Sequence, residues 1–340
     1  MTKRSSDLDV VKGVLILLVI LGHCIQFGSG QEYNTETRFF ENRLYIVIYS
    51  FHMPLFVAVS GYLFAGSAQR YTPWKTLQKK AERLLLPIFS WSILYTVYQL
   101  FLMWWHGERI SGQVILSEWG RQFSVSQWFL WAIFLFSIVV LIGKYWFRDS
   151  VWFYLTLYAL IAWIVVPDNR FNLNTYIANY PFFMIGYFGG KQIREQRKKW
   201  DERYGKPAFW GTLAAYILLL LPKLTMQLSL SVRMDRVYYL LLGASGGAVV
   251  LKGLLFAAKR YSAKRGVRKL AETGKITLGL YVISGFLSTE VLKKATRGFS
   301  YHIGVSFLET AAVLLVSVVL IRGIQRSSIL NRCLLGNRRA

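Results

Sequence analysis

Long apolar runs, separated by short polar connections, dominate this chain from end to end. Ten such runs fall at residues 9–28, 44–65, 85–105, 127–142, 151–166, 174–190, 207–222, 237–257, 276–292 and 304–321. Most have the length that a tilted helix needs to cross a hydrocarbon core of about 30 Å, although the fourth to the seventh are short. The pattern therefore predicts an all-α, polytopic integral membrane protein with about ten transmembrane helices.

The composition agrees with this class. Of 340 residues, 54% are hydrophobic and 17% are charged, and the mean hydropathy is +0.36. These values are typical of a membrane protein. The connections are too short for a soluble domain, so we expect a single transmembrane domain over residues 1–340. Cys24 and Cys333 lie at opposite ends of the chain and predict neither a disulfide framework nor a metal site. The first run lacks a small-residue cleavage site and is interpreted as a retained span.

The formal net charge of +24 follows the predicted topology. Of the 41 Lys and Arg residues, 28 lie at the two termini and in the even-numbered connections, and 11 lie in the odd-numbered ones. The most basic connections, 191–206 and 259–275, are on the same side. The positive-inside rule then places both termini in the cytoplasm. We therefore expect contact with membrane lipid and with an anionic cytoplasmic ligand, and no nucleic-acid partner.

A lysine and a histidine share one face of the first apolar run. Lys12 and His23 are eleven residues apart, and eleven steps of about 100° return to nearly the same face, about 16 Å along the helix. His52 lies in the second run, at a predicted depth similar to that of His23, whereas Lys12 lies near the cytoplasmic end. Ionisable groups inside a membrane are costly and usually functional, so the pattern favours acid–base chemistry within the bilayer.

Structural roles for the same residues stay open at this point. Asp9 precedes Lys12 by three residues, so a local ion pair is expected, and Lys12 also has the reach to extend to the interface. A single intramembrane histidine such as His52 often only bonds a neighbouring helix. His106 and His302 fall at span ends or in outer loops and are interpreted as surface residues.

Six sequence blocks carry a resemblance to a known family. They are DVVKGVLILLVILGH at 9–23, FHMPLFVAVSGYLF at 51–64, KAERLLLP at 80–87, QWFLW at 127–131, YPFFMIGY at 180–187 and GKITLGLY at 274–281. In this order they resemble acyltransferase family 3, the polytopic membrane O-acyltransferases, and especially the branch similar to fucose 4-O-acetylases. The second block is the most specific, and Ser60 and Gly61 within it are residues that allow helices to approach closely.

The resemblance implies an enzyme that takes acetyl-CoA, or a related acyl-CoA, from the cytoplasm without a metal ion. It implies transfer of the acyl group to a hydroxyl of an envelope glycan or lipid-linked sugar, in a multi-pass protein of a bacterial inner membrane. Lys12, His23 and His52 are then the catalytic residues. His23 acts as the general base or as a transient acyl carrier, and His52 orients the acceptor or stabilises the oxyanion.

The remaining candidates would bind the two substrates. Lys80 and Arg83, with Lys12, lie where the phosphates of the CoA donor would arrive. Trp128 and Trp131 are candidates for stacking on the acceptor sugar, although membership of an interfacial aromatic belt explains them as well. Tyr281 is a candidate proton donor, with core packing as its other role.

Two positions depart from the family pattern. Many members carry arginine where this chain has Lys12, and lysine lacks the planar fork that binds anions in a bidentate manner. The branch that this chain resembles commonly has lysine there. The sixth block often continues with a histidine, and here Tyr281 is followed by Val, Ile and Ser284. Any role of that histidine is therefore absent or altered, and His302 is too distant along the chain to replace it.

Two other classes of protein compete with an acyltransferase. In a transporter or channel, Lys12, His23 and His52 would form a proton or substrate path. Such proteins often show internal repeats and matching broken helices, and the sequence shows neither. In a glycan-assembly protein the same residues would carry no acyl-transfer chemistry. The acceptor glycan, the acyl group and the oligomeric state stay open.

Overall fold

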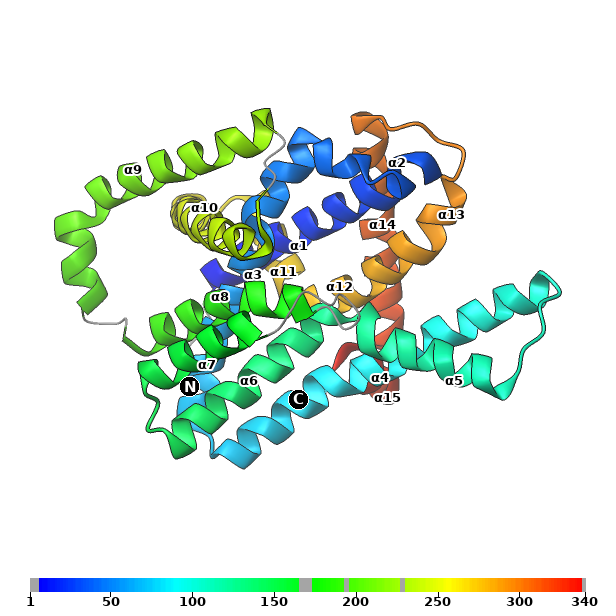
Figure 1. The fold of residues 1–340 in the computed structure, drawn as a ribbon, viewed down its shortest axis with the longest axis horizontal. Coiled ribbons are helices and arrows are strands. Elements are labelled where there is room, and N and C mark those ends of the chain that lie inside the picture. Colours follow the sequence, from blue (N-terminus) through cyan, green and yellow to red (C-terminus); the bar gives the residue numbers. More distant parts are fainter. Residues whose placement is uncertain (1–5, 165–172, 193–195, 227–229, 338–340) are drawn as a thin grey trace. The chain divides into compact units, whose positions relative to one another are not determined.

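The structure, a computed structural model, describes residues 6–164, 173–192, 196–226 and 230–337, and within 192–204 it describes the backbone alone (Figure 1). Over these ranges the chain forms helices joined by short connections, and it forms no strand. The prediction of an all-α protein with several apolar helices is therefore confirmed.

Seven helices in the described part are long and apolar enough to cross a membrane. They are α1 (Ser6–Phe27), α3 (Arg43–Arg70), α4 (Pro73–Trp105), α6 (Trp128–Trp146), α9 (Gln196–Thr225), α10 (Val232–Arg260) and α14 (Ile303–Ile324). A bent pair of helices could form an eighth span. Its first part is α11 (Arg265–Lys275), and its second part runs from the start of α12 (Thr277–Phe286) to Ala295. The two parts meet at an angle of 75°.

The two other predicted spans correspond to shorter or less apolar helices. Run 151–166 forms α7 (Val151–Ile164), and its last two residues lie outside the described part; run 174–190 forms α8 (Leu173–Gln192). The total of ten spans and the cytoplasmic placement of both termini stay predictions. Two of the connections contain helices of their own: α11 occupies most of 259–275, and α5 and η2 occupy most of 106–126.

Short helices complete the described part. They are α2 (Gln31–Thr35), η1 (Arg38–Glu41), α5 (Gly112–Arg121), η2 (Gln122–Ser126), η4 (Leu287–Leu292), α13 (Lys293–Ala295) and α15 (Ser328–Leu335). The segments η2 and η4 are π-helical, a rare geometry that is frequent at functional sites.

The chain divides into two compact units, each made of two stretches of sequence. The first contains residues up to Ala65 and Pro181–Val318, and the second contains Gly66–Tyr180 and the residues from Val319 onward. Each unit is described by itself below. The expectation of a single domain over residues 1–340 stays a prediction.

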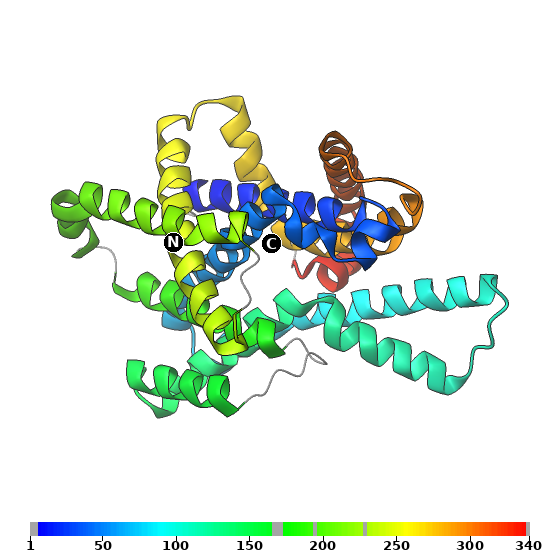
Figure 2. The same cartoon turned by 45° about the horizontal axis from the view of Figure 1, so that its top comes forward.

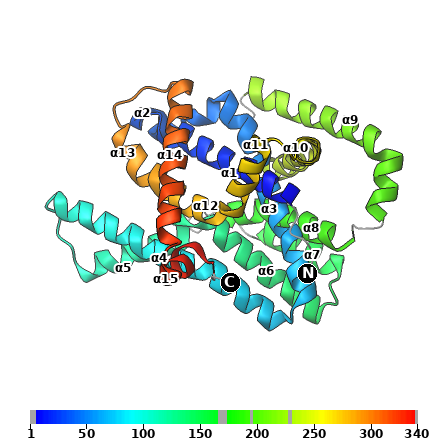
Figure 3. The same ribbon diagram turned by 180° about the vertical axis from the view of Figure 1, so that it is seen from behind.

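In the first unit, α1 packs against α10, α11 and α12 (Figures 2 and 3). The contact between α1 and α11 is made by two glycines. A Cβ atom at Gly13 would collide with the carbonyl oxygen of Leu270, and one at Gly274 would collide with the carbonyl oxygen of Asp9. The absence of both side chains lets the two backbones touch. The packing fixes the helix that carries Lys12 and His23.

The second block of the sequence, on α3, is held by close backbone contacts in the same unit. A Cβ atom at Gly61 would collide with the carbonyl oxygen of Phe183 on α8, and one at Gly186 would collide with that of Ala58. The prediction that Gly61 allows a close helix approach is confirmed. On α10, a Cβ atom at Gly243 would lie 2.7 Å from Cγ of Pro54. The middle of α3, which carries His52, is therefore fixed by two neighbouring helices.

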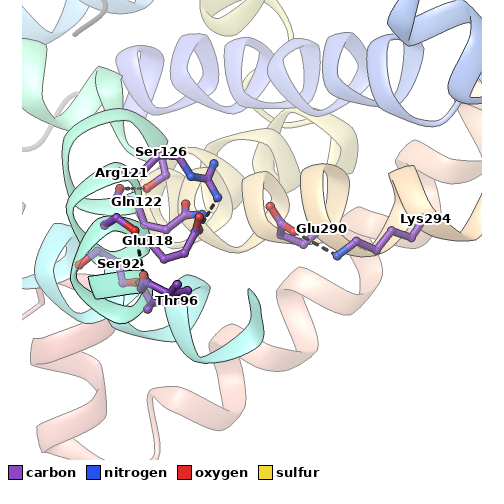
Figure 4. A network of polar contacts seen from close by, with 10 residues as sticks. Ser92, Thr96, Glu118, Arg121, Gln122, Ser126, Glu290 and Lys294 are labelled. Atoms are coloured by element: carbon purple, nitrogen blue, oxygen red, sulfur yellow. Dashed lines mark hydrogen bonds and ion pairs between the residues drawn. The ribbon is translucent and has the colours of Figure 1, made fainter. Parts of the chain in front are cut away.

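In the second unit, α4 and α5 lie side by side as a hairpin (Figure 2), and α6 and α15 pack against α4. The indole of Trp91 donates a hydrogen bond of 3.0 Å to the carbonyl oxygen of Leu334. Figure 4 shows several polar contacts of this unit, and it also draws the pair of Glu290 and Lys294 from the first unit. Arg121 forms a 2.6 Å ion pair with Glu118, and Thr96 donates a 2.7 Å hydrogen bond to the Ser92 carbonyl.

Candidate active site

The last four carbonyl groups of α1, at the end that follows His23, all lie within hydrogen-bond distance of a donor. The amide of Gly28 donates to the Cys24 carbonyl and the hydroxyl of Ser29 to the Ile25 carbonyl, both at 2.8 Å. The side chain of Asn34 donates to the Gln26 carbonyl at 3.1 Å. The hydroxyl of Thr296 lies 3.4 Å from the Phe27 carbonyl oxygen and shares its proton with the Leu292 carbonyl at 2.9 Å. Helix ends normally leave these groups unsatisfied, so the capping gives α1 a well-defined end near His23.

The expected ion pair at the start of α1 is formed. Lys12 Nζ lies 2.6 Å from Asp9 Oδ1, and the two side chains are 17% and 4% exposed. The pair lowers the cost of burying each charge. Lys12 is therefore already partnered, and a donor phosphate that binds Lys12 would compete with the Asp9 carboxylate.

The two histidines are brought together where α1 meets α3. Gly22 packs on Tyr49 so closely that a Cβ atom there would lie 2.7 Å from Cε2 of the tyrosine. The Tyr49 ring in turn meets the His52 ring edge to face, with centroids 4.5 Å apart. His23 follows Gly22 directly in the sequence of α1, so it lies next to this contact. The similar depth of the two imidazoles stays a prediction.

The buried environment of His52 fixes its tautomer. The residue is 1% exposed, and its Nδ1 atom lies 2.8 Å from the carbonyl oxygen of Ile48, one helical turn earlier. A carbonyl oxygen only accepts hydrogen bonds, so Nδ1 carries the proton. The neutral ring then presents an unprotonated Nε2, which is able to accept a hydrogen bond or a proton.

His23 lies half-buried beside an aromatic ring. Its Nδ1 atom is buried and has no hydrogen-bond partner among the described residues. The ring packs edge to face on Phe27, with centroids 5.9 Å apart, and the ammonium group of Lys293 lies 5.9 Å from the centroid of Phe27. Buried polar atoms in proteins are nearly always paired, so the unpaired nitrogen points to a missing partner.

Tyr281 and Ser284 are both buried on α12, in the same unit. Tyr281 is 8% exposed. Ser284 is completely buried, and its hydroxyl oxygen has no partner in the described part of the chain. At the position where the family pattern often has histidine, this protein therefore buries a small polar group against its core.

The other four predicted residues belong to the second unit. Lys80 is half-buried and Arg83 is exposed, both in the first turns of α4. Trp128 and Trp131 lie in the first turn of α6, both half-buried. The indole N–H of Trp131 donates a 2.8 Å hydrogen bond to the carbonyl oxygen of Phe123, which favours a structural role for that residue.

Two buried polar residues of the first unit were missed by the sequence interpretation. Glu309 on α14 is 9% exposed, Ser288 in η4 is completely buried, and neither side chain has a hydrogen-bond partner among the residues described. A signal for Glu309 was present, because it is the only ionisable residue in the apolar run 304–321. Within the described ranges, no three His, Cys, Asp or Glu side chains are grouped to hold a metal ion.

The sequence of this chain matches a known protein family. The model of the acyltransferase domain family Acyl_transf_3 matches residues 5–322. The chain belongs to this family. The family expected from the six sequence blocks is therefore confirmed.

Two curated relatives carry the same name. The chain is similar to the nodulation protein NolL of Sinorhizobium fredii (strain NBRC 101917 / NGR234), with 31% identity over 193 residues, or 57% of this chain and 50% of that protein. The nodulation protein NolL of Mesorhizobium japonicum (strain LMG 29417 / CECT 9101 / MAFF 303099) is 29% identical over 203 residues, 58% of this chain and 52% of the relative. The chain thus spans about half the length of each. No solved structure matches.

Proposed function

We propose that this member of the acyltransferase family moves a short acyl group, by default acetyl, from cytoplasmic acyl-CoA to a hydroxyl of an envelope glycan or glycolipid. The setting is a bacterial inner membrane, with both termini in the cytoplasm. The observation that carries the proposal is the state of the two histidine side chains in the first unit. His23 has a buried Nδ1 atom without a hydrogen-bond partner among the described residues, and the Nδ1 atom of the buried His52 donates to a carbonyl.

The chemistry requires a base, because an alcohol is a weak nucleophile at neutral pH. His23 takes the proton from the acceptor hydroxyl as its oxygen attacks the thioester carbonyl carbon. The tetrahedral intermediate then loses the CoA thiolate, the carbon–sulfur bond breaks, and the thiolate takes the proton from His23. His52 orients the acceptor, or it stabilises the oxyanion when its ring is protonated.

The donor would occupy the face of α1 that Lys12 and His23 share. CoA separates its phosphates from its thioester by an extended pantetheine arm. A cation at one end of the helix and a reacting imidazole about 16 Å away suit such a molecule. Lys80 and Arg83 add further cationic charge for the phosphates in this proposal, and Trp128 and Tyr281 serve the acceptor.

The test uses membranes from cells that express the protein, incubated with labelled acetyl-CoA. We expect label in glycan from the wild type and a loss of about 100-fold or more in His23→Ala. His302→Ala is the matched control, because His302 is exposed and only accepts a hydrogen bond from the amide of Gly304. Normal transfer by His23→Ala would refute the role of His23, and absence of transfer by the wild type would favour a transport or assembly role.

A further inference from the structure

Glu309 is a buried carboxylate for which the proposed mechanism has no use. It lies on α14 with 9% of its surface exposed, and both carboxylate oxygens are buried without a partner within the described part of the chain. An unpaired buried carboxylate costs several kcal/mol of stability, so proteins rarely keep one without a function. Membrane helices make the case stronger, since no water is available in their apolar surroundings.

The carboxylate lies against the end of the helix that carries His23. A Cβ atom at Gly28 would collide with Oε2 of Glu309 and would lie 2.6 Å from its Cδ atom. Gly28 immediately follows Phe27, the last residue of α1. Only the absence of a side chain at Gly28 makes room for the carboxylate. Glu309 is thus held one to two helical turns beyond His23, at the same end of the unit.

Ser288 is a second buried polar residue whose side chain has no hydrogen-bond partner within the described part of the chain. It belongs to the π-helical segment η4, which packs against α1. Cys24, on the turn of α1 between His23 and Gly28, packs with Ile20, with Val313 of α14 and with neighbouring leucines. Ser288 and Glu309 therefore lie on two segments that both pack against the last turns of α1.

The chemistry of these side chains suits a ligand that donates hydrogen bonds. The carboxylate of Glu309 only accepts them, and it lies at the C-terminal end of α1, where the ammonium group of Lys293 is 5.9 Å from the centroid of Phe27. A sugar ring presents neighbouring hydroxyl groups, which donate to the two carboxylate oxygens and also exchange a hydrogen bond with a serine hydroxyl.

We propose that Glu309 and Ser288 bind the acceptor sugar through neighbouring hydroxyl groups of its ring. The inference rests on the proposed function, and it assigns the acceptor end of the site to the contact between α14 and the end of α1. The segment 296–301 reaches the same end of the unit. It is joined there by hydrogen bonds from the Gln31 amide to the Arg297 carbonyl, from the Arg297 guanidinium to the Gln31 side-chain oxygen, and from Thr296 to the Phe27 carbonyl.

The first experiment measures binding of sugars to the purified full-length protein in nanodiscs. The probes are the methyl glycosides of fucose, glucose and galactose, titrated without donor by calorimetry. We expect at least one to bind, with affinity reduced about 10- to 100-fold in Glu309→Gln, because hydrogen bonds to charged groups are the stronger kind. Glu290→Gln is the matched control, since Glu290 already pairs with Lys294 at 3.5 Å (Figure 4).

A second pair of variants tests the geometry without changing the carboxylate. Gly28→Ala places a methyl group where Oε2 lies and should weaken sugar binding as Glu309→Gln does. Gly298→Ala should be silent, because no atom lies within 4 Å of a Cβ at that position. Melting temperatures of all four variants check that folding is preserved.

Three results would overturn the inference. They are that no glycoside binds the wild type, that Glu309→Gln binds as well as the wild type, or that Glu290→Gln loses as much affinity as Glu309→Gln. The transfer assay separates this inference from the proposed function. A wild-type enzyme that transfers acetyl groups, combined with an unchanged acceptor KM in Glu309→Gln, would leave the function intact and exclude the acceptor role of Glu309.

Discussion

The ammonium group of Lys12 and the carboxylate of Asp9 form a 2.6 Å ion pair within the first helix. Asp9 is buried, so its charge depends on Lys12. Loss of the lysine would therefore remove a candidate donor contact and also take from a buried carboxylate its lysine partner.

We expect Lys12→Ala to be destabilised by about 3–5 kcal/mol, the usual cost of breaking a buried pair from one side. The double variant Asp9→Asn with Lys12→Met should recover most of that stability, because it removes both charges. Thermal unfolding in detergent measures the stability of both variants relative to the wild type. If the double variant is stable and its KM for acetyl-CoA equals that of the wild type, Lys12 has no role in donor binding.

His52 offers a substitution that separates packing from chemistry. The side-chain amide of asparagine is able to replace Nδ1 as a donor to the Ile48 carbonyl, but it offers nothing in the place of Nε2. His52→Asn should therefore keep a near-normal melting temperature and lose about 100-fold or more in kcat. The melting temperature and kcat of His52→Asn are compared with those of His52→Phe, which loses both nitrogen atoms. Equal kcat in wild type and His52→Asn would assign His52 to structure alone.

The contact of Gly22 with Tyr49 sets the separation of the two histidines. In Gly22→Ala the new methyl group would meet the tyrosine ring at 2.7 Å, so α1 and α3 must separate or the ring must turn. We expect a loss of about 1–3 kcal/mol of stability and a lower kcat. Gly253→Ala on α10 is the control, because nothing lies within 4 Å of a Cβ there. An active, fully stable Gly22→Ala would show that the separation is not critical.

The two tryptophans of α6 should respond differently to substitution. Trp131→Phe leaves the Phe123 carbonyl without its 2.8 Å donor and should cost about 1–3 kcal/mol of stability. Trp128→Phe should leave stability nearly unchanged and raise the acceptor KM if its ring stacks on sugar. Melting temperatures and acceptor titrations of both variants distinguish the roles. A destabilised Trp128→Phe with normal KM would place both residues in the core.

A reporter fused to the C-terminus tests the topology. With ten spans and a cytoplasmic N-terminus, a fluorescent reporter at the C-terminus should fold and a periplasmic phosphatase should stay inactive. A second fusion after residue 109 should give the opposite result, because the connection 106–126 is predicted on the outer side. Activity of the phosphatase at the C-terminus would mean an odd number of spans.

The parts of the candidate site that the sequence predicted are those that depend on helical spacing alone. Lys12, His23 and Asp9 lie on one helix, and a regular repeat of about 100° per residue determines which of them share a face or form a pair. The same regularity predicted the apolar helices. Local spacing did not predict the 75° bend between α11 and α12, nor the close contact of Gly274 with the Asp9 carbonyl of α1 beside that bend.

Contacts between distant segments were the other part that spacing could not supply. Glu309 was visible as a lone acidic residue, but only the packing of α14 against Gly28 shows that it shares an end of the unit with His23. The tautomer of His52 likewise required the position of its ring relative to Ile48. For Ser284, the family resemblance implied a changed site, and the structure adds that its hydroxyl is buried and has no hydrogen-bond partner among the described residues.

The capped end of α1 has a consequence for making hybrid enzymes. Its last carbonyl groups are held by Gly28 and Ser29, but also by Asn34 and Thr296, the last of which comes from near the other end of the chain. A hybrid that exchanges only the segment after α1, or only the segment around Thr296, would leave one of these carbonyls without its donor. Attempts to change acceptor preference by grafting loops from a relative should therefore move both segments together.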